Sequence, residues 1–269
     1  MIWSLFLAIL PLVSGTVLVK YSAAAGDQTS ALGLLNLGGY DDAQWPSGQS
    51  QNDSAYFKTA TDPNGVPAAH VHKAQHFARA EYHLLKGKTE VDKTYYIGYH
   101  VMWKNVDYQT IVMQWKNYDP KTTPTANIPA CLVFRNDASG SANHTMQVFR
   151  YSTIFHLNAE PDPTVGNANS VWAKQLNMGT AYRFGFVINT SQTKGYLQLY
   201  FNGALSTLTD PSTGKTTQKL AGNFWPGPTV DPKFGLYGGK NNLVDDSYIY
   251  EIVVGTELAD IAAVAGIST

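Results

Sequence analysis

The feature that most constrains this fold is a series of short segments in which apolar residues alternate with polar ones or are β-branched. Alternation with a period of two places apolar side chains on one face of a β-strand, whereas an amphipathic helix needs a period near 3.6. Only residues 256–267 resemble a helix. Strands are predicted over Thr16–Tyr21, Phe77–Leu85, Tyr95–Trp103, Thr110–Lys116, Ala130–Arg135, Met146–Tyr151, Ala181–Asn189, Gly195–Phe201, Lys233–Tyr237 and Tyr248–Val254.

Many short strands without an internal repeat favour an all-β jelly-roll sandwich of two curved antiparallel sheets. The segments over 182–188 and 195–201 predict a hairpin, and Asn202-Gly203 after them is typical of a tight turn. The polar stretches 44–65 and 119–129 are interpreted as loops, because strand-like segments resume after each. With 269 residues, 44% of them hydrophobic, we expect one jelly-roll domain over residues 16–269.

The N-terminus indicates the compartment. The apolar run Ile2–Val13 is shorter than the roughly 20 residues of a membrane span and suits a signal peptide, with small residues at 13–15 for cleavage. The run carries no Lys or Arg, which leaves a buried first strand as the alternative. We expect residues 1–15 to be a signal peptide, the protein to be secreted and extracellular, and no membrane association to remain after cleavage. Glycosylation sequons at Asn52, Asn143 and Asn189 agree with secretion.

Charge and motifs exclude several function classes. The 19 basic and 20 acidic residues give a net charge of -1, so nucleic acid is not an expected partner. The single cysteine, Cys131, cannot form an internal disulfide, and no motif for a nucleotide, a serine esterase or a metalloprotease appears in its context. The segment Glu90–Tyr95 lacks the third acidic residue of a sandwich-type glycosidase, which makes a hydrolase a third choice. We expect a monomer without an organic cofactor.

Three predicted strands carry polar groups on one face. Alternation places Arg79, Glu81 and His83 together and opposes them to small and aromatic residues. A solvated outer face is the simpler interpretation of such a row, but the same arrangement recurs in two other strands. Together they offer the groups that an anionic sugar needs. In the second strand, the polar face carries Thr110, Val112, Gln114 and Lys116, and the opposite face carries Ile111, Met113 and Trp115. In the third strand, the polar face carries Lys233 and Tyr237, and the opposite face carries Phe234 and Leu236.

The histidines His70, His72, His76 and His83 lie close together in the sequence. The spacing His70-Val-His72 lacks the downstream ligands of a zinc protease, so loop or cleft histidines are favoured over a zinc site. His76 precedes the strand of Arg79 and is a candidate acid/base or carboxylate-binding group. A polar residue that anchors a loop is an equal alternative for His76.

The segments Arg79-Ala-Glu81, Gln114-Trp-Lys116 and Lys233-Phe-Gly-Leu-Tyr237 resemble the RxExR, Q-x-H and YFKAGxY signatures of jelly-roll polysaccharide lyases, in the same order. Over roughly residues 70–255 the chain most resembles polysaccharide lyase family 20, the fungal glucuronan lyases. Family 7 alginate lyases and heparinase-like lyases are relatives. The resemblance implies a concanavalin A-like fold. His83 and Lys116 replace an arginine and a histidine of the alginate lyases, which favours β-1,4-glucuronan as the acidic polysaccharide.

The resemblance implies β-elimination at a 4-linked uronate, which removes the C5 proton and expels the C4 oxygen. Arg79 and Gln114 would neutralise the substrate carboxylate. Tyr237 would take the C5 proton or protonate the leaving oxygen, with its pKa lowered by nearby cations, and His76 is the other candidate for proton transfer. The resemblance further implies substrate binding by Lys116, Lys233, His83 and Glu81.

A structural calcium is a further expectation, because related jelly rolls often carry one where the C-terminal strand meets the N-terminal one. We place it at Asp246, in Asp245-Asp246 before the final strand, with backbone carbonyls of the N-terminal segment. A plain turn is the alternative. Two other functions stay open, an alginate lyase of the same fold and a non-catalytic, lectin-like carbohydrate-binding module. A phenol beside a guanidinium favours the enzyme.

Overall fold

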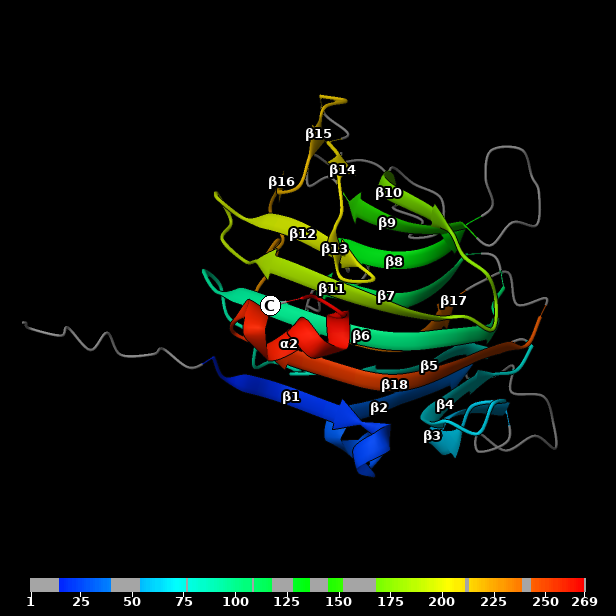
Figure 1. The fold of residues 1–269 in the computed structure, drawn as a ribbon. Helices are drawn as coiled ribbons and strands as arrows, with labels where there is room; N and C mark the ends of the chain where they lie inside the picture. The colour runs from blue at the N-terminus through cyan, green and yellow to red at the C-terminus, as the bar shows by residue number, and fades with distance from the viewer. Residues whose placement is uncertain are drawn as a thin grey trace, which may run out of the picture.

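Two antiparallel β-sheets are stacked against each other with a hydrophobic core between them (Figure 1). The computed structural model describes residues 15–39, 54–75, 77–107, 109–117, 128–135, 145–151, 168–210, 213–238 and 243–268. The predicted all-β jelly roll is confirmed.

The first sheet, here called sheet A, has the strand order β13-β12-β11-β6-β18-β4-β3, with β1 paired to β18 and β16 paired to β12. Its strands are β1 (Val17–Ser22), β3 (Ala55–Thr61), β4 (Pro67–Lys73), β6 (Thr94–Asn105), β11 (Ala181–Asn189), β12 (Tyr196–Phe201), β13 (Ala204–Leu205), β16 (Leu220–Ala221) and β18 (Asp245–Gly255).

The second sheet, sheet B, has the order β10-β9-β8-β7-β17-β5-β2. Its strands are β2 (Leu34–Gly39), β5 (Phe77–His83), β7 (Thr110–Asn117), β8 (Ala130–Arg135), β9 (Thr145–Tyr151), β10 (Ala168–Gln175) and β17 (Val230–Gly238). The remaining elements are the short hairpin β14 (Leu208–Thr209) and β15 (Thr216–Thr217), the 3-10 helices η1 (Ala23–Ala25) and η2 (Thr29–Leu32), and the helix α2 (Leu258–Ala265).

Aromatic side chains from both sheets fill the core. Trp103 and Tyr99 of sheet A and Trp115 and Phe234 of sheet B are at most 1% exposed. The rings of Tyr99 and Phe234 meet across the sheets with centroids 4.8 Å apart. Full burial of a side chain as large as Phe stabilises a fold by about 1.5–3 kcal/mol, so these contacts hold the two sheets together.

Helix α2 covers the outer face of sheet A where β6, β11 and β18 lie (Figure 1). Ile261 and Val264 of the helix pack on Val253. Gly98 of β6 lies beneath them, and a Cβ atom there would come within 3.0 Å of Val264, so glycine permits this close packing. The side chains of Glu257 and Asp260 form a capping box at the start of α2, which confirms the helix predicted within residues 256–267.

A buried ion pair of sheet A is linked to sheet B by a hydrogen bond. Lys73 Nζ lies 2.9 Å from Asp245 Oδ2, and both side chains are fully buried. Asp245 also accepts hydrogen bonds from the backbone N–H of Asp107 at 2.5 Å and from Thr110 Oγ1 at 3.1 Å. Burial raises the pKa of Asp245, and Lys73 opposes that shift. Since Lys73 and Asp245 belong to sheet A and Thr110 to sheet B, this network fixes one end of the sandwich.

All ten predicted strands are present, but four longer strands were missed: β2, β3, β4 and β10. The prediction that residues 44–65 form only a loop is wrong, because β3 lies within them. Ala55 and Phe57 of β3 do alternate inward, but the surrounding polar residues hide the pattern.

The hairpin of β11 and β12 is confirmed, and Asn202 and Gly203 turn with φ of 47° and 83° as predicted. Residues 1–14 lie outside the described ranges, so the signal peptide stays a prediction. None of the helices in the described ranges combines the length and the hydropathy that a membrane-spanning helix requires.

We predict that Lys73→Met destabilises the protein by about 3–5 kcal/mol, because it leaves the buried carboxylate of Asp245 without its cation. Urea unfolding followed by circular dichroism measures the change. The matched control is Lys93→Met. Lys93 pairs with Glu90 at 3.7 Å on the surface, with both side chains at least 60% exposed, so its loss should change stability by less than about 1 kcal/mol. Equal effects of the two substitutions would contradict a structural role for the buried pair.

Candidate active site

Strand β17 lies between β5 and β7 in sheet B and brings the predicted polar residues together. Tyr237 is opposite Arg79, and Lys233 is opposite both His83 and Gln114. Residues directly opposite each other in antiparallel strands share a face. Phe234 of β17 packs in the core, so these polar side chains occupy the face of sheet B that is turned away from it. Lys116 joins them there, opposite Asp231.

Arg79 and Tyr237 are in direct contact. The guanidinium carbon of Arg79 lies 4.8 Å from the centroid of the Tyr237 ring, a cation–π arrangement. Asn36 of β2 adds a polar group that the sequence did not indicate. With its amide oxygen turned toward these donors, it accepts from Arg79 Nη1 at 3.2 Å and Lys233 Nζ at 3.3 Å. Asn36 thus holds both cations beside each other.

Glu81 and Gln114 form a buried pair, each 1% exposed, in which Gln114 Nε2 donates to Glu81 Oε1. This contact orients Gln114, and the substrate-binding role of Glu81 stays a prediction. Among the described residues, Glu81 Oε2 and Gln114 Oε1 have no hydrogen-bond partner. Buried polar atoms in native proteins are nearly always satisfied, so these two oxygens suit a site completed by a ligand or by water.

His83 is nearly fully buried and faces an acid rather than an open surface. Its Nε2 lies 3.1 Å from Asp231 Oδ2. Burial alone would raise the pKa of Asp231, but hydrogen bonds from His83, Thr89 and Gly87 lower it. This contact shows what holds the imidazole, and the substrate-binding role of His83 stays a prediction. Asp231 was missed because the predicted strand begins at Lys233, two residues later, whereas β17 begins at Val230.

Burial shapes the proton affinities of this face. It lowers the pKa of Lys116 to about 8, with a further contribution from the charge of Lys233. Burial also lowers the pKa of Lys233, opposed by Glu81. The pKa of Tyr237 is raised by burial, and Arg79 only partly opposes this. The expectation that cations lower the Tyr237 pKa overall is therefore wrong, because desolvation of the phenolate outweighs them.

A β-bulge changes the predicted faces of β7. The register with β8 shifts between Ile111 and Met113. As a result Val112, predicted on the polar face, lies in the core, and Ile111, predicted in the core, packs in a small apolar cluster with Tyr237. An inserted residue reverses the alternation beyond it, which no period-two pattern can anticipate. Ile111 thereby supports the Tyr237 ring.

Two other predicted residues lie elsewhere. His76 falls outside the described residues, so its proton-transfer role stays a prediction. Asp246 is in sheet A, on β18, opposite His72 of β4. The predicted N-terminal partner for Asp246 is wrong, because β1 pairs with residues 251–255 at the other end of β18. Asp245 and Asp246 also begin the strand rather than forming a turn before it.

No protein-family model matches the sequence, and a search of curated proteins finds no match. Many solved structures share its architecture, including the following three. The alginate lyase AlyC3 has a TM-score of 0.52 and 12% identity over 81% of this chain and 83% of that one. The catalytic domain of the glycoside hydrolase family 131 protein from Coprinopsis cinerea has a TM-score of 0.51 and 11% identity over 92% of this chain and 97% of that one. The T. cruzi calreticulin globular domain has a TM-score of 0.52 and 9% identity over 93% of this chain and 94% of that one.

These likenesses establish the fold alone. The chain has the jelly-roll fold found in an alginate lyase, and the same fold occurs in a glycoside hydrolase domain and in a calreticulin domain. One fold hosts unrelated activities, so function has to be argued from the side chains of the site.

We predict that Gly235→Ala disrupts the site and destabilises the protein. Gly235 has φ of +142°, and an added Cβ would collide with the backbone of Ala80 and Glu81. Gly238→Ala on the same strand is the matched control, because its φ is +74° but its Cβ would meet nothing closer than 3.7 Å. The control should cost about 1–3 kcal/mol from φ alone. Thermal unfolding should show a larger loss for Gly235→Ala, and an equal or smaller loss would contradict this account.

Proposed function

We propose that this protein is a polysaccharide lyase that cleaves an acidic polysaccharide by β-elimination at the outer face of sheet B. The observation that carries the proposal is the set of three cationic side chains and one phenol on that face. Arg79, Lys116 and Lys233 perturb one another electrostatically, and Arg79 lies against the Tyr237 ring. A largely buried cationic face favours an anionic ligand, and a phenol beside it can supply a proton-transfer group.

The reaction balances without water. A base takes the C5 proton of a 4-linked uronate, the C–H electron pair becomes the C4–C5 double bond, the C4–O bond breaks, and the leaving oxygen receives a proton. The carboxylate beside C5 opposes the build-up of negative charge, so its charge has to be neutralised. In this proposal Arg79 and Lys233, which both hydrogen-bond to Asn36, bind that carboxylate, and the second N–H of Gln114 donates to it.

Tyr237 is assigned as the proton donor to the leaving oxygen. Because burial raises its pKa, the phenol stays protonated at neutral pH and is a poor base. Contact with Arg79 favours the phenolate once the proton has been given away. Arg79 therefore limits the rise of the Tyr237 pKa, and the phenol stays protonated until the leaving oxygen takes its proton.

Lys116 is assigned as the base at C5. An ordinary lysine is almost fully protonated at neutral pH, but a pKa of about 8 leaves a usable fraction as the neutral amine. Burial is the main cause of that low pKa, and desolvated lysines are well suited to act as general bases. His76, outside the described residues, is the alternative base.

The preferred substrate is proposed to be unsulfated β-1,4-glucuronan. Arg79, Lys116 and Lys233, with Lys86 near Lys233, outnumber the acids Glu81 and Asp231, which leaves a small net positive charge. Such a balance suits one carboxylate per sugar better than dense sulfate. Alginate also carries one carboxylate per residue and is the nearest rival. A polymeric substrate outside the cell agrees with the proposed secretion of the protein.

The decisive experiment is an ultraviolet assay of unsaturated products on glucuronan, polymannuronate, polyguluronate and heparin. We expect the fastest initial rate on glucuronan. Faster elimination on polymannuronate or polyguluronate would make alginate the preferred substrate and leave the proposed mechanism unchanged. Binding of a polymer without any unsaturated product would instead support the lectin-like module and overturn the lyase.

We predict that Tyr237→Phe lowers turnover at least ~10²-fold, because it removes only the proton that the phenol transfers. Polymer binding should persist, since the ring still packs on Arg79 and Ile111. Tyr196→Phe is the matched control: its ring also stacks under a cation, Lys219 at 3.8 Å, but it lies in sheet A. Wild-type turnover in Tyr237→Phe would remove this residue from the mechanism.

We predict that kcat/KM rises as pH increases through about 8, because only the neutral form of Lys116 accepts the C5 proton. Lys116→Arg keeps the charge but cannot lose its proton, and should abolish most activity and the rise with it. A rise centred near 6.5 that persists in Lys116→Arg would assign the base to a histidine instead, with His76 the first to test.

A further inference from the structure

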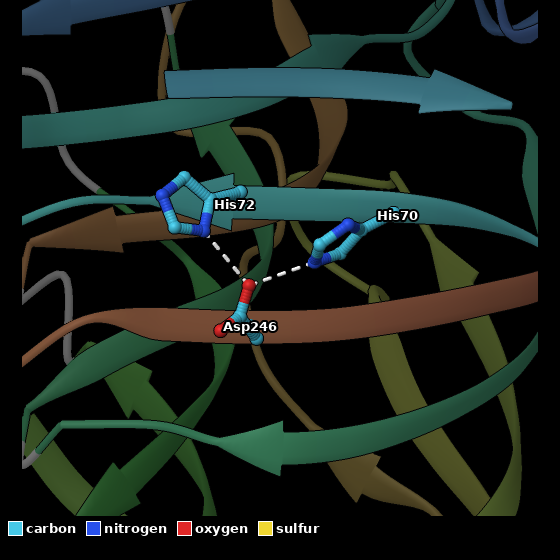
Figure 2. A group of neighbouring side chains, drawn as sticks. All are labelled: His70, His72 and Asp246. Atoms are coloured by element: carbon cyan, nitrogen blue, oxygen red, sulfur yellow. Dashed lines mark hydrogen bonds and ion pairs between the residues drawn. The ribbon is translucent and has the colours of Figure 1, made fainter. Parts of the chain in front are cut away.

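Three metal-ligating side chains converge on the outer face of sheet A. His70 Nε2 lies 2.7 Å and His72 Nδ1 lies 2.8 Å from the same carboxylate oxygen, Oδ1 of Asp246 (Figure 2). One ligand atom from each residue lies within 4.8 Å of the other two. His70 and His72 are two residues apart on β4 and therefore share a face, and Asp246 is opposite His72 on β18. The cluster is built on paired strands, which hold it rigidly.

Two tyrosines fix the orientation of both imidazoles. The His70 ring stacks on Tyr248 with centroids 4.6 Å apart and planes 8° apart, and the His72 ring stacks on Tyr56 at 4.8 Å and 17°. Tyr56 Oη lies 3.2 Å from His70 Nδ1, the ring nitrogen that points away from Asp246. A histidine that binds a metal through one nitrogen usually hydrogen-bonds through the other, and Tyr56 provides that partner.

The donor set identifies the class of ion. Calcium prefers six to eight oxygen ligands, so two imidazole nitrogens beside one carboxylate do not fit the calcium expected at Asp246. Imidazole and carboxylate suit zinc and similar divalent transition metals, which often take three protein ligands and leave the fourth position to water. We propose that His70, His72 and Asp246 form a binding site for a divalent transition metal of the zinc class.

Surroundings and access agree with this site. The three ligand side chains are 15–19% exposed, which leaves them open to solvent on one side. Lys58 is the nearby cation, and its ammonium is held 3.8 Å above the Tyr56 ring.

The site is separate from the candidate active site. It lies on sheet A, whereas Arg79 and Tyr237 lie on the outer face of sheet B. The proposal therefore does not depend on lyase activity, and its test uses no substrate. Loss of metal binding would leave the lyase proposal intact, and absence of lyase activity would leave the metal site intact.

The test is a zinc titration of the whole protein after chelator treatment and removal of the chelator, in competition with a chromogenic zinc indicator. We expect one zinc ion per chain, and cobalt bound in its place should give the visible absorption of a tetrahedral site. His72→Gln and Asp246→Asn each replace a proposed zinc ligand. Losing an outer hydrogen-bond partner of a ligand weakens metal binding by up to about 100-fold, so these two substitutions should weaken zinc binding by at least ~100-fold. Tyr56→Phe removes only such a partner and should weaken binding about 10-fold.

His100→Gln is the matched control, because His100 is another partly buried histidine of sheet A, 3.8 Å from Glu251. It should bind zinc like the wild type. Asp246→Asn retains an amide oxygen that can accept from both imidazoles, so near-ultraviolet circular dichroism should be unchanged and loss of folding is separated from loss of binding. Absence of zinc binding in the wild type, equal affinity in all variants, or calcium binding that survives His72→Gln but not Asp246→Asn would overturn the proposal.

Discussion

The register of β17 between β5 and β7 is the constraint on which the candidate active site depends. It sets Tyr237 against Arg79 and Lys233 against Gln114. A slip of one residue would turn both polar side chains into the core and expose Phe234, which is fully buried. Burying a side chain of this size stabilises the fold by about 1.5–3 kcal/mol. Core packing therefore fixes the register of β17, and that register positions the side chains of the site.

The electrostatics of the site follow from placing cations on a face that is largely covered. Burial disfavours the charged form of Lys116 and Lys233, and it also disfavours the phenolate of Tyr237. Glu81 and Asp231 supply part of the missing negative charge, but both are committed to neighbouring side chains. An anionic sugar would complete the balance, which is why the same arrangement can both bind a polyuronate and prepare groups for proton transfer.

The first two residues of β18 connect the interior with the outer surface. Adjacent residues of a strand face opposite sides, so Asp245 turns inward to Lys73 while Asp246 turns outward to His70 and His72. The inner carboxylate ties the two sheets together, and the outer one joins the candidate metal ligands. Since both sit on one rigid strand, the internal ion pair also positions the external cluster.

The sequence by itself determined the all-β class, the ten most regular strands and the polar faces of β5 and β17, because a period-two pattern is local and survives without neighbours. Only the tertiary structure decided the bulge in β7, the hydrogen bond between Asn36 and Arg79, and the contacts of Asp246 with His70 and His72. These depend on which strands lie side by side, and residues up to 176 positions apart meet there. The direction of the Tyr237 pKa shift was also beyond the sequence, because burial and a nearby charge oppose each other and only the folded packing sets their balance.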